Sequence, residues 1–175
     1  MTDREFLEAE YKLAASEPSD IVDHIPLLRA LASECRHVTE MGVRTGVSTR
    51  ALLVEDCILR CYDLELDPSV SLLFETARRL NKDVRYIVGN TLAINIEETD
   101  MLFIDTDHTY KQLSMELHLH GRKARKFLAF HDTGEPYGGA LLPAIMEFLA
   151  ARSDWRVRFH TPACHGFTVL ERITS

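Results

Sequence analysis

The sequence predicts a Rossmann-like α/β fold, a doubly wound, mostly parallel sheet of seven strands with helices on both faces. From His37 onward, short apolar runs alternate with helical patterns, which is typical of parallel strands joined by helical crossovers. Glycines and polar residues directly follow these runs, at the positions where ligands bind in open α/β sheets. The last two runs, 155–160 and 166–172, are separated only by a short turn, which predicts an antiparallel C-terminal strand.

Size and composition indicate one globular domain. The chain has 175 residues, of which 46% are hydrophobic and 27% charged, enough for one continuous core. We expect an N-terminal helical cap over residues 1–36 and a Rossmann-like core over 37–175. No apolar run approaches the roughly 20 residues that a bilayer requires. The charged N-terminus lacks the apolar core of a signal peptide, so we expect a cytoplasmic protein without a membrane partner.

Charge and cysteine content exclude further classes of function. The net charge of −7 argues against nucleic acid as a partner, because phosphate binding depends on clustered Lys and Arg. The four cysteines have neither the CxxC spacing of a zinc site nor the density of a disulfide scaffold. We expect reduced thiols that are mostly buried.

The individual elements follow from apolar periodicity. Two N-terminal helices are predicted over 3–15 and 25–34, and Pro26 is tolerated in the first turn of the second. This part of the chain could cover a cofactor or shape the mouth of a substrate site. The predicted parallel strands cover 38–41, 58–62, 84–88, 101–104 and 127–130. The predicted helices between and after them cover 48–54, 69–80, 111–123 and 139–152.

A glycine loop follows the first strand, in the segment VTEMGVRTGVSTRALL at 38–53. The pattern is a buried strand, a tight turn and a helix whose first amides face a ligand. The spacing Glu40-x-Gly42-x-x-x-Gly46 is neither a dinucleotide fingerprint nor a P-loop, which favours a nucleoside cofactor without a diphosphate. S-adenosylmethionine fits this description. The alternative is that the glycines serve only the turn.

Polar residues end the other strands. Asp63 ends the second strand, where an acid holds ribose hydroxyls in such folds. Asp105 follows the fourth strand, and His131 and Asp132 follow the fifth. Since the carboxyl ends of neighbouring parallel strands share one edge, these three side chains could converge on a divalent cation such as Mg²⁺. His131 could equally bind substrate.

Five segments together resemble, in order and spacing, the class I S-adenosylmethionine-dependent methyltransferases. They are VTEMGVRTGVSTRALL, CYDLEL, YIVGNT, DMLFIDTDHTYKQLSMEL and LAFHDT. The resemblance covers about 37–172. Within that family, the segments look like the small O-methyltransferase branch, which includes macrolide-sugar O-methyltransferases and cephalosporin hydroxylase-like proteins. It implies a methionine-side loop, a ribose ligand and a residue by the adenine. The residues assigned to cofactor binding are Glu40, Gly42, Gly46, Ser48, Asp63, Asn90 and Asp105.

The resemblance also implies the catalytic groups. Relatives carry acids at the positions of Asp105 and Asp132 and bind Mg²⁺, so the metal ligands would be Asp105, His131 and Asp132. His131 departs from relatives that have a second acid there. His108 of the FIDTDHTY segment would be the general base, since imidazole titrates near neutral pH. The alternatives are that Asp105 only caps a helix and that His108 is structural. Asp107 is expected to cap the helix that starts near 109.

The leading hypothesis is therefore an S-adenosylmethionine-dependent O-methyltransferase acting on a hydroxyl of a small sugar or natural product, with Mg²⁺ assistance and His108 as base. One alternative is a protein that binds S-adenosylmethionine without methyl transfer. Another is a metal-dependent hydrolase built on Asp105, His131 and Asp132. The identity of the acceptor and homodimerisation stay open.

Overall fold

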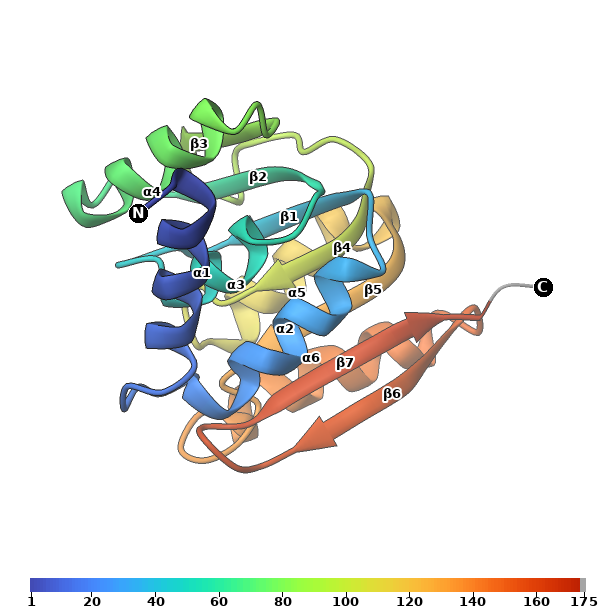
Figure 1. Ribbon diagram of the computed structural model, residues 1–175. Helices are drawn as coiled ribbons and strands as arrows, with labels where there is room; N and C mark the ends of the chain where they lie inside the picture. Colours follow the sequence, from blue (N-terminus) through green and yellow to red (C-terminus); the bar gives the residue numbers. More distant parts are fainter. Residues whose placement is uncertain (174–175) are drawn as a thin grey trace.

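The computed structural model describes residues 1–173 and contains one seven-stranded sheet in the order β3-β2-β1-β4-β5-β7-β6 (Figure 1). This confirms the predicted Rossmann-like architecture. The strands are β1 His37–Met41, β2 Ile58–Asp63, β3 Val84–Val88, β4 Thr99–Ile104, β5 Ala124–His131, β6 Trp155–Thr161 and β7 Phe167–Arg172. The α-helices are α1 Asp3–Ala14, α2 Ile25–Ser33, α3 Val47–Leu53, α4 Pro68–Arg79, α5 Tyr110–His120 and α6 Gly138–Ala150. Short 3₁₀ helices cover Val22–His24 and Gly121–Lys123.

The direction of the strands determines which edge of the sheet can bind a ligand. β1 pairs in parallel with β2 and β4, and the parallel ladder continues outward to β3 and β5. β7 is antiparallel to both of its neighbours, β5 and β6, as the sequence predicts. The chain winds outward in opposite directions on the two sides of β1. The carboxyl ends of β1 and β4 therefore flank the crevice where open α/β sheets bind ligands.

The core lies on both faces of the sheet. In β4, Met101 and Phe103 pack with buried residues of α1 to α4, whereas Leu102 and Ile104 pack with buried residues of α5 and α6. Successive side chains of a strand point to opposite faces, so this alternation follows directly from strand geometry. Figure 1 shows the resulting three layers of helices, sheet and helices.

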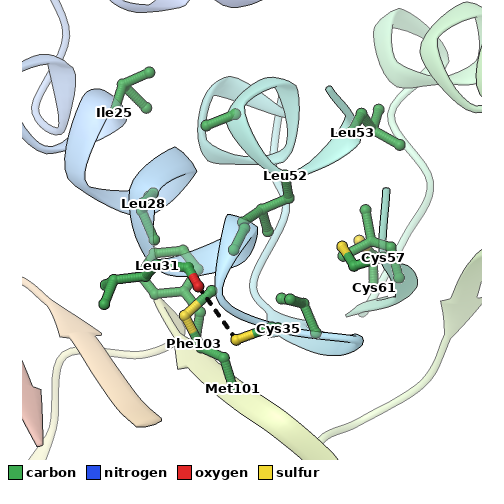
Figure 2. Packing of buried hydrophobic residues seen from close by; sticks show 14 of the residues in the cluster. Ile25, Leu28, Leu31, Cys35, Leu52, Leu53, Cys57, Cys61, Met101 and Phe103 are labelled. Atoms are coloured by element: carbon green, nitrogen blue, oxygen red, sulfur yellow. Dashed lines mark hydrogen bonds between the residues drawn. The ribbon is translucent and has the colours of Figure 1, made fainter. Parts of the chain in front are cut away.

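The first face holds the larger apolar cluster. Figure 2 shows Leu28 and Leu31 of α2 with Leu52 of α3, gathered over Phe103 of β4. The Cys35 thiol donates a hydrogen bond to the Leu31 carbonyl oxygen at 3.2 Å. All four cysteines are free, and Cys35, Cys57 and Cys61 are buried, which confirms the expected burial.

Helix α5 differs from its prediction at both ends. The Thr109 hydroxyl accepts from the Gln112 amide at 3.3 Å, so Thr109 is the N-cap and the assignment of this role to Asp107 is wrong. Asp107 instead accepts from the Thr109 hydroxyl at 3.1 Å. The helix ends at His120, and a 3₁₀ turn over Gly121–Lys123 follows it. A Cβ added at Gly121 would lie 2.8 Å from the Phe148 ring, so glycine permits close packing of this turn on α6.

The N-terminal part of the chain reaches the site through its linker. α1 begins with a capping box of Thr2 and Glu5, and it packs on α3 and α4. α2 packs on α3, and Arg29 of α2 pairs with Glu8 at 2.9 Å. The segment 15–24 between these helices runs along the carboxyl edge of the sheet, where Asp20 contacts the site. Among residues 1–173, no helix is long and apolar enough to span a bilayer.

Candidate cofactor and metal site

The loop between β1 and α3 needs both of its glycines. Gly42 has a φ of +85°, and a Cβ there would lie 1.9 Å from the Asp105 carbonyl oxygen. Gly46 has a φ of +74°, and its Cβ would lie 2.5 Å from Val70 Cγ1. Only glycine combines this backbone conformation with so close an approach. The loop is therefore held against the end of β4 on one side and against α4 on the other.

Glu40 supports the same loop from beneath. Its carboxylate is completely buried and accepts from Ser48 Oγ at 2.6 Å, Thr49 Oγ1 at 2.8 Å and Cys61 Sγ at 3.0 Å. Burial raises the pKa of Glu40 to about 7, although the three hydrogen bonds act in the opposite direction. These bonds tie the first turn of α3 to β1 and β2. Glu40 therefore stabilises the conformation of the loop.

Asp63 orders the backbone of the loop. Its Oδ2 atom accepts from the amides of Val43 and Arg44, both at 2.8 Å. Its Oδ1 atom accepts from the Leu64 amide at 2.6 Å. Each carboxylate oxygen has two lone pairs, so Oδ1 keeps a lone pair for a further donor such as a sugar hydroxyl.

Two hollows meet at the carboxyl edge of the sheet. The first encloses about 280 Å³, and the predicted cofactor residues that line it are Gly42, Asp63, Asn90 and Asp105. The second encloses about 340 Å³ and is lined by Ser48 together with Asp20 of the N-terminal linker. Arg44 and Asp105 line both hollows. Together the two provide the volume of a small-molecule site and fit an elongated ligand that crosses the loop.

The predicted metal ligands converge. Asp105, His131 and Asp132 offer one ligand atom each, and these atoms lie within 4.8 Å of one another. The pairing of Ile104 with Phe130 explains this, because the residues after these two positions emerge side by side. Asp132 has a φ of +57°, a conformation that costs energy for a residue with a side chain and that clusters at functional sites.

The two ring nitrogens of His131 have different surroundings. Nε2 faces the carbonyl oxygens of Asp20 at 3.0 Å and Cys164 at 3.3 Å, which only accept, so Nε2 carries a proton. Nδ1 lies 3.4 Å from Asp105 Oδ1 and 3.1 Å from Asp132 Oδ2. Burial alone would lower the pKa of His131, but the two carboxylates outweigh it and raise the pKa to about 10. The cluster thus requires a positive charge, either on the imidazole or on a bound cation.

The donor set fits a divalent cation. Among residues 1–173, neither His131 Nδ1 nor Asp132 Oδ1 has a hydrogen-bond partner of good geometry, although both atoms are buried. Buried polar atoms are rarely left in this state. Carboxylate oxygens suit Mg²⁺ or Mn²⁺, and an imidazole nitrogen shifts the preference toward transition metals. Asp105, His131 and Asp132 would hold such an ion.

Two further histidines border the cluster. His108 Nε2 lies 2.7 Å from Asp132 Oδ2, and the His108 ring lies 4.2 Å from the ring of Tyr137. His165 Nδ1 lies 3.3 Å from Asp132 Oδ1. Sequence reasoning missed His165 because it lies in the turn between β6 and β7, where periodicity indicates only a hairpin. The pairing of β7 with β5 brings this turn to Asp132.

The chain matches no protein-family model and no curated protein at the level of sequence. Solved structures, in contrast, align over nearly its whole length. The N-methyltransferase NodS from Bradyrhizobium japonicum, solved with S-adenosylhomocysteine, aligns with a TM-score of 0.66 at 13% identity, over 99% of this chain and 100% of that one. An O-methyltransferase from Bacillus cereus, also with S-adenosylhomocysteine, aligns with a TM-score of 0.65 at 16% identity, over 97% and 90%. A methyltransferase from Podospora anserina gives 0.61 at 14% identity, over 98% and 88%. The chain therefore has the Rossmann-like fold of these methyltransferases.

Proposed function

We propose that the protein is an S-adenosylmethionine-dependent O-methyltransferase that acts on a hydroxyl of a small molecule of the sugar or natural-product type. The observation that carries the proposal is the position of Asp105. This residue lines the cavity that fits the nucleoside and also belongs to the candidate metal cluster. The proposed cofactor site and the proposed metal site would therefore share the Asp105 side chain.

On the donor side, the loop from Gly42 to Gly46 would hold the methionine part, with Ser48 at its far end. Ser48 lines the second hollow, which continues from the first at Arg44 and Asp105. Asp63 would accept from the ribose, for which its Oδ1 atom has a remaining lone pair. Asn90 lines the first cavity beyond Asp63 and would lie by the adenine.

On the acceptor side, methyl transfer is an in-line displacement that needs an aligned and deprotonated nucleophile. A divalent cation such as Mg²⁺, when bound, lowers the pKa of a coordinated hydroxyl and orients it. His108 would take the proton. Its Nε2 atom lies 2.7 Å from Asp132 Oδ2, and this carboxylate would stabilise the imidazolium that forms when Nδ1 accepts a proton.

Calorimetry with S-adenosylmethionine and S-adenosylhomocysteine tests the donor half of the proposal. Micromolar binding of both is expected, and Asp63→Ala should weaken it at least tenfold, because this change removes the ribose acceptor and the support of the loop. Asp67 caps α4 and lines neither hollow, so Asp67→Asn is the matched control. If neither compound binds, the proposal is wrong.

A screen with S-adenosylmethionine labelled in its methyl group tests the acceptor half. Transfer to polyhydroxylated acceptors and not to amines is expected. Binding without transfer to any acceptor would favour a non-methylating protein. The second candidate function is a metal-dependent hydrolase built on the cluster of Asp105, His131 and Asp132. Turnover of an ester or phosphodiester without S-adenosylmethionine would favour that function.

A further inference from the structure

A buried polar network lies beside the first cavity, outside the groups assigned above. Glu116 of α5 has no exposed surface, and its carboxylate accepts three hydrogen bonds. The donors are Thr91 Oγ1 at 2.6 Å, Thr106 Oγ1 at 2.8 Å and Gln112 Nε2 at 2.9 Å. These donors come from the loops after β3 and β4 and from the preceding turn of α5. Glu116 therefore fixes three side chains that all line the cavity.

The network determines the orientation of the Gln112 amide. Its Nε2 atom donates to Glu116 and also to Thr91 Oγ1 at 3.1 Å. A flipped amide would place an oxygen against a carboxylate that only accepts, so the nitrogen must face Glu116. The Gln112 Oε1 atom is thus directed away from the network, and within residues 1–173 it accepts no hydrogen bond. Gln112 is half-buried and lines the cavity.

Asn90 offers a hydrogen-bond donor, rather than an acceptor, to the same cavity. Its Oδ1 atom accepts from the Leu92 amide at 2.9 Å, which leaves its Nδ2 atom as a donor. The wall of the cavity therefore offers one amide acceptor, from Gln112, and one amide donor, from Asn90. Adenine is complementary to this pair, since its 6-amino group donates and its ring nitrogens accept. Hypoxanthine has a 6-oxo acceptor and a donating N1–H, which is the reverse pattern.

We propose that Gln112 Oε1 determines base specificity by accepting a hydrogen bond from the 6-amino group of the cofactor's base. Glu116 is a positioning residue that holds the Gln112 amide in the orientation needed for this bond. The proposal rests on the proposed function, because it assumes that the first cavity holds the nucleoside. A ligand that presents an oxygen to Gln112 Oε1 loses a hydrogen bond and leaves two acceptors facing each other. Sites built to hydrogen-bond one group reject such analogues strongly.

The test compares S-adenosylhomocysteine with S-inosylhomocysteine, which differ at position 6 of the purine. Calorimetry on the wild-type chain should give a preference for the adenosyl compound of at least about tenfold. Gln112→Leu removes the reading oxygen, so the preference should fall to within about threefold. Glu116→Gln should reduce it as well, because an amide at 116 no longer fixes the direction of the Gln112 amide. Lys111→Gln, an exposed change on the same helix, should leave the preference unchanged.

The ratio of the two affinities separates this role from a structural one, since a general loosening of the site weakens both ligands alike. Equal binding of the two compounds by the wild-type chain would overturn the inference while leaving the proposed function intact. Full retention of the preference in Gln112→Leu would do the same. If Glu116→Gln fails to fold, the half-buried Gln112 still provides the decisive variant. A chain that binds neither compound refutes the proposed function and this inference together.

Discussion

His108 Nε2 lies 2.7 Å from Asp132 Oδ2, while His131 Nδ1 lies 3.1 Å from the same oxygen. One carboxylate thus joins the proposed base to the proposed metal ligands. Its other oxygen, Oδ1, faces His165 at 3.3 Å. Nearby imidazoles lower the pKa of Asp132 despite its burial, so the carboxylate is kept ionised in its acceptor role.

His108→Gln should slow methyl transfer by about 10²- to 10⁴-fold, the usual contribution of a general base. Affinity for S-adenosylhomocysteine should stay within about twofold, because His108 does not line the first cavity. Single-turnover kinetics and calorimetry would measure the two effects. The exposed His118 of α5 offers a matched control, and His118→Gln should change neither quantity. Unimpaired transfer by His108→Gln would remove this residue from the mechanism.

Asp105→Asn should abolish the binding of divalent cations. Titration calorimetry with Mg²⁺, Mn²⁺ and Zn²⁺ on the ligand-free chain would detect this without any activity assay, and it would also rank the metals. Because one donor is an imidazole nitrogen, Mn²⁺ should bind more tightly than Mg²⁺. Asp107→Asn changes an exposed acid two positions away and should leave metal binding intact. If EDTA and Asp105→Asn both leave methyl transfer unchanged, no metal takes part.

Glu40 should make stability fall as the pH rises from about 4.5 to about 7. Its pKa is about 7 in the folded chain against an ordinary value of 4.5, so the folded state holds the proton more tightly than the unfolded state. The contribution to stability is complete below pH 4.5 and is lost as the pH passes 7. The total loss is on the order of 3 kcal/mol.

Glu40→Gln mimics the protonated form and should remove this part of the pH dependence. Urea unfolding of the wild type and of Glu40→Gln would give the free energy of unfolding at pH 5 and at pH 8. Comparing the change with pH between the two chains cancels the contributions of other titrating groups. The exposed Glu17 supplies the control variant Glu17→Gln, whose pH dependence should match the wild type. An unchanged pH dependence in Glu40→Gln would show that Glu40 titrates normally.

Gly42→Ala should destabilise the chain by about 3 kcal/mol or more, because the new Cβ would meet the Asp105 carbonyl oxygen at 1.9 Å. Binding of S-adenosylhomocysteine should be lost with it. Gly139→Ala is the contrasting substitution, since an added Cβ there meets nothing within 4 Å and the residue lies in the first turn of α6. That variant should be neutral or slightly stabilised. Thermal unfolding of both variants provides the comparison.

The sequence contains enough information for the sheet and for part of the site. Continuous apolar runs such as 101–104 predict a strand buried on both faces, and the strand-end rule then brings Asp105, His131 and Asp132 together. Both steps use only local periodicity and the known direction of parallel strands. The convergence of these three residues was therefore predictable without any structure.

The remaining features depend on contacts between distant segments. The position of His165 depends on how β7 pairs with β5, and the network of Glu116 depends on how α5 packs on two loops. No periodic pattern signals either one. The capping role assigned to Asp107 was wrong for a local reason, since Asp107 and Thr109 are both good N-cap residues and only the backbone geometry selects Thr109.

The hydrogen bonds of His131 Nε2 to the carbonyl oxygens of Asp20 and Cys164 have a consequence for biosynthesis. These two residues are 144 positions apart, so the cluster is complete only when the turn before β7 has left the ribosome. Domains generally fold as units during synthesis, and β7 lies between β5 and β6 in the single sheet of this domain. The cluster around Asp132 is therefore a late feature of folding, although its three candidate metal ligands come from the middle of the chain.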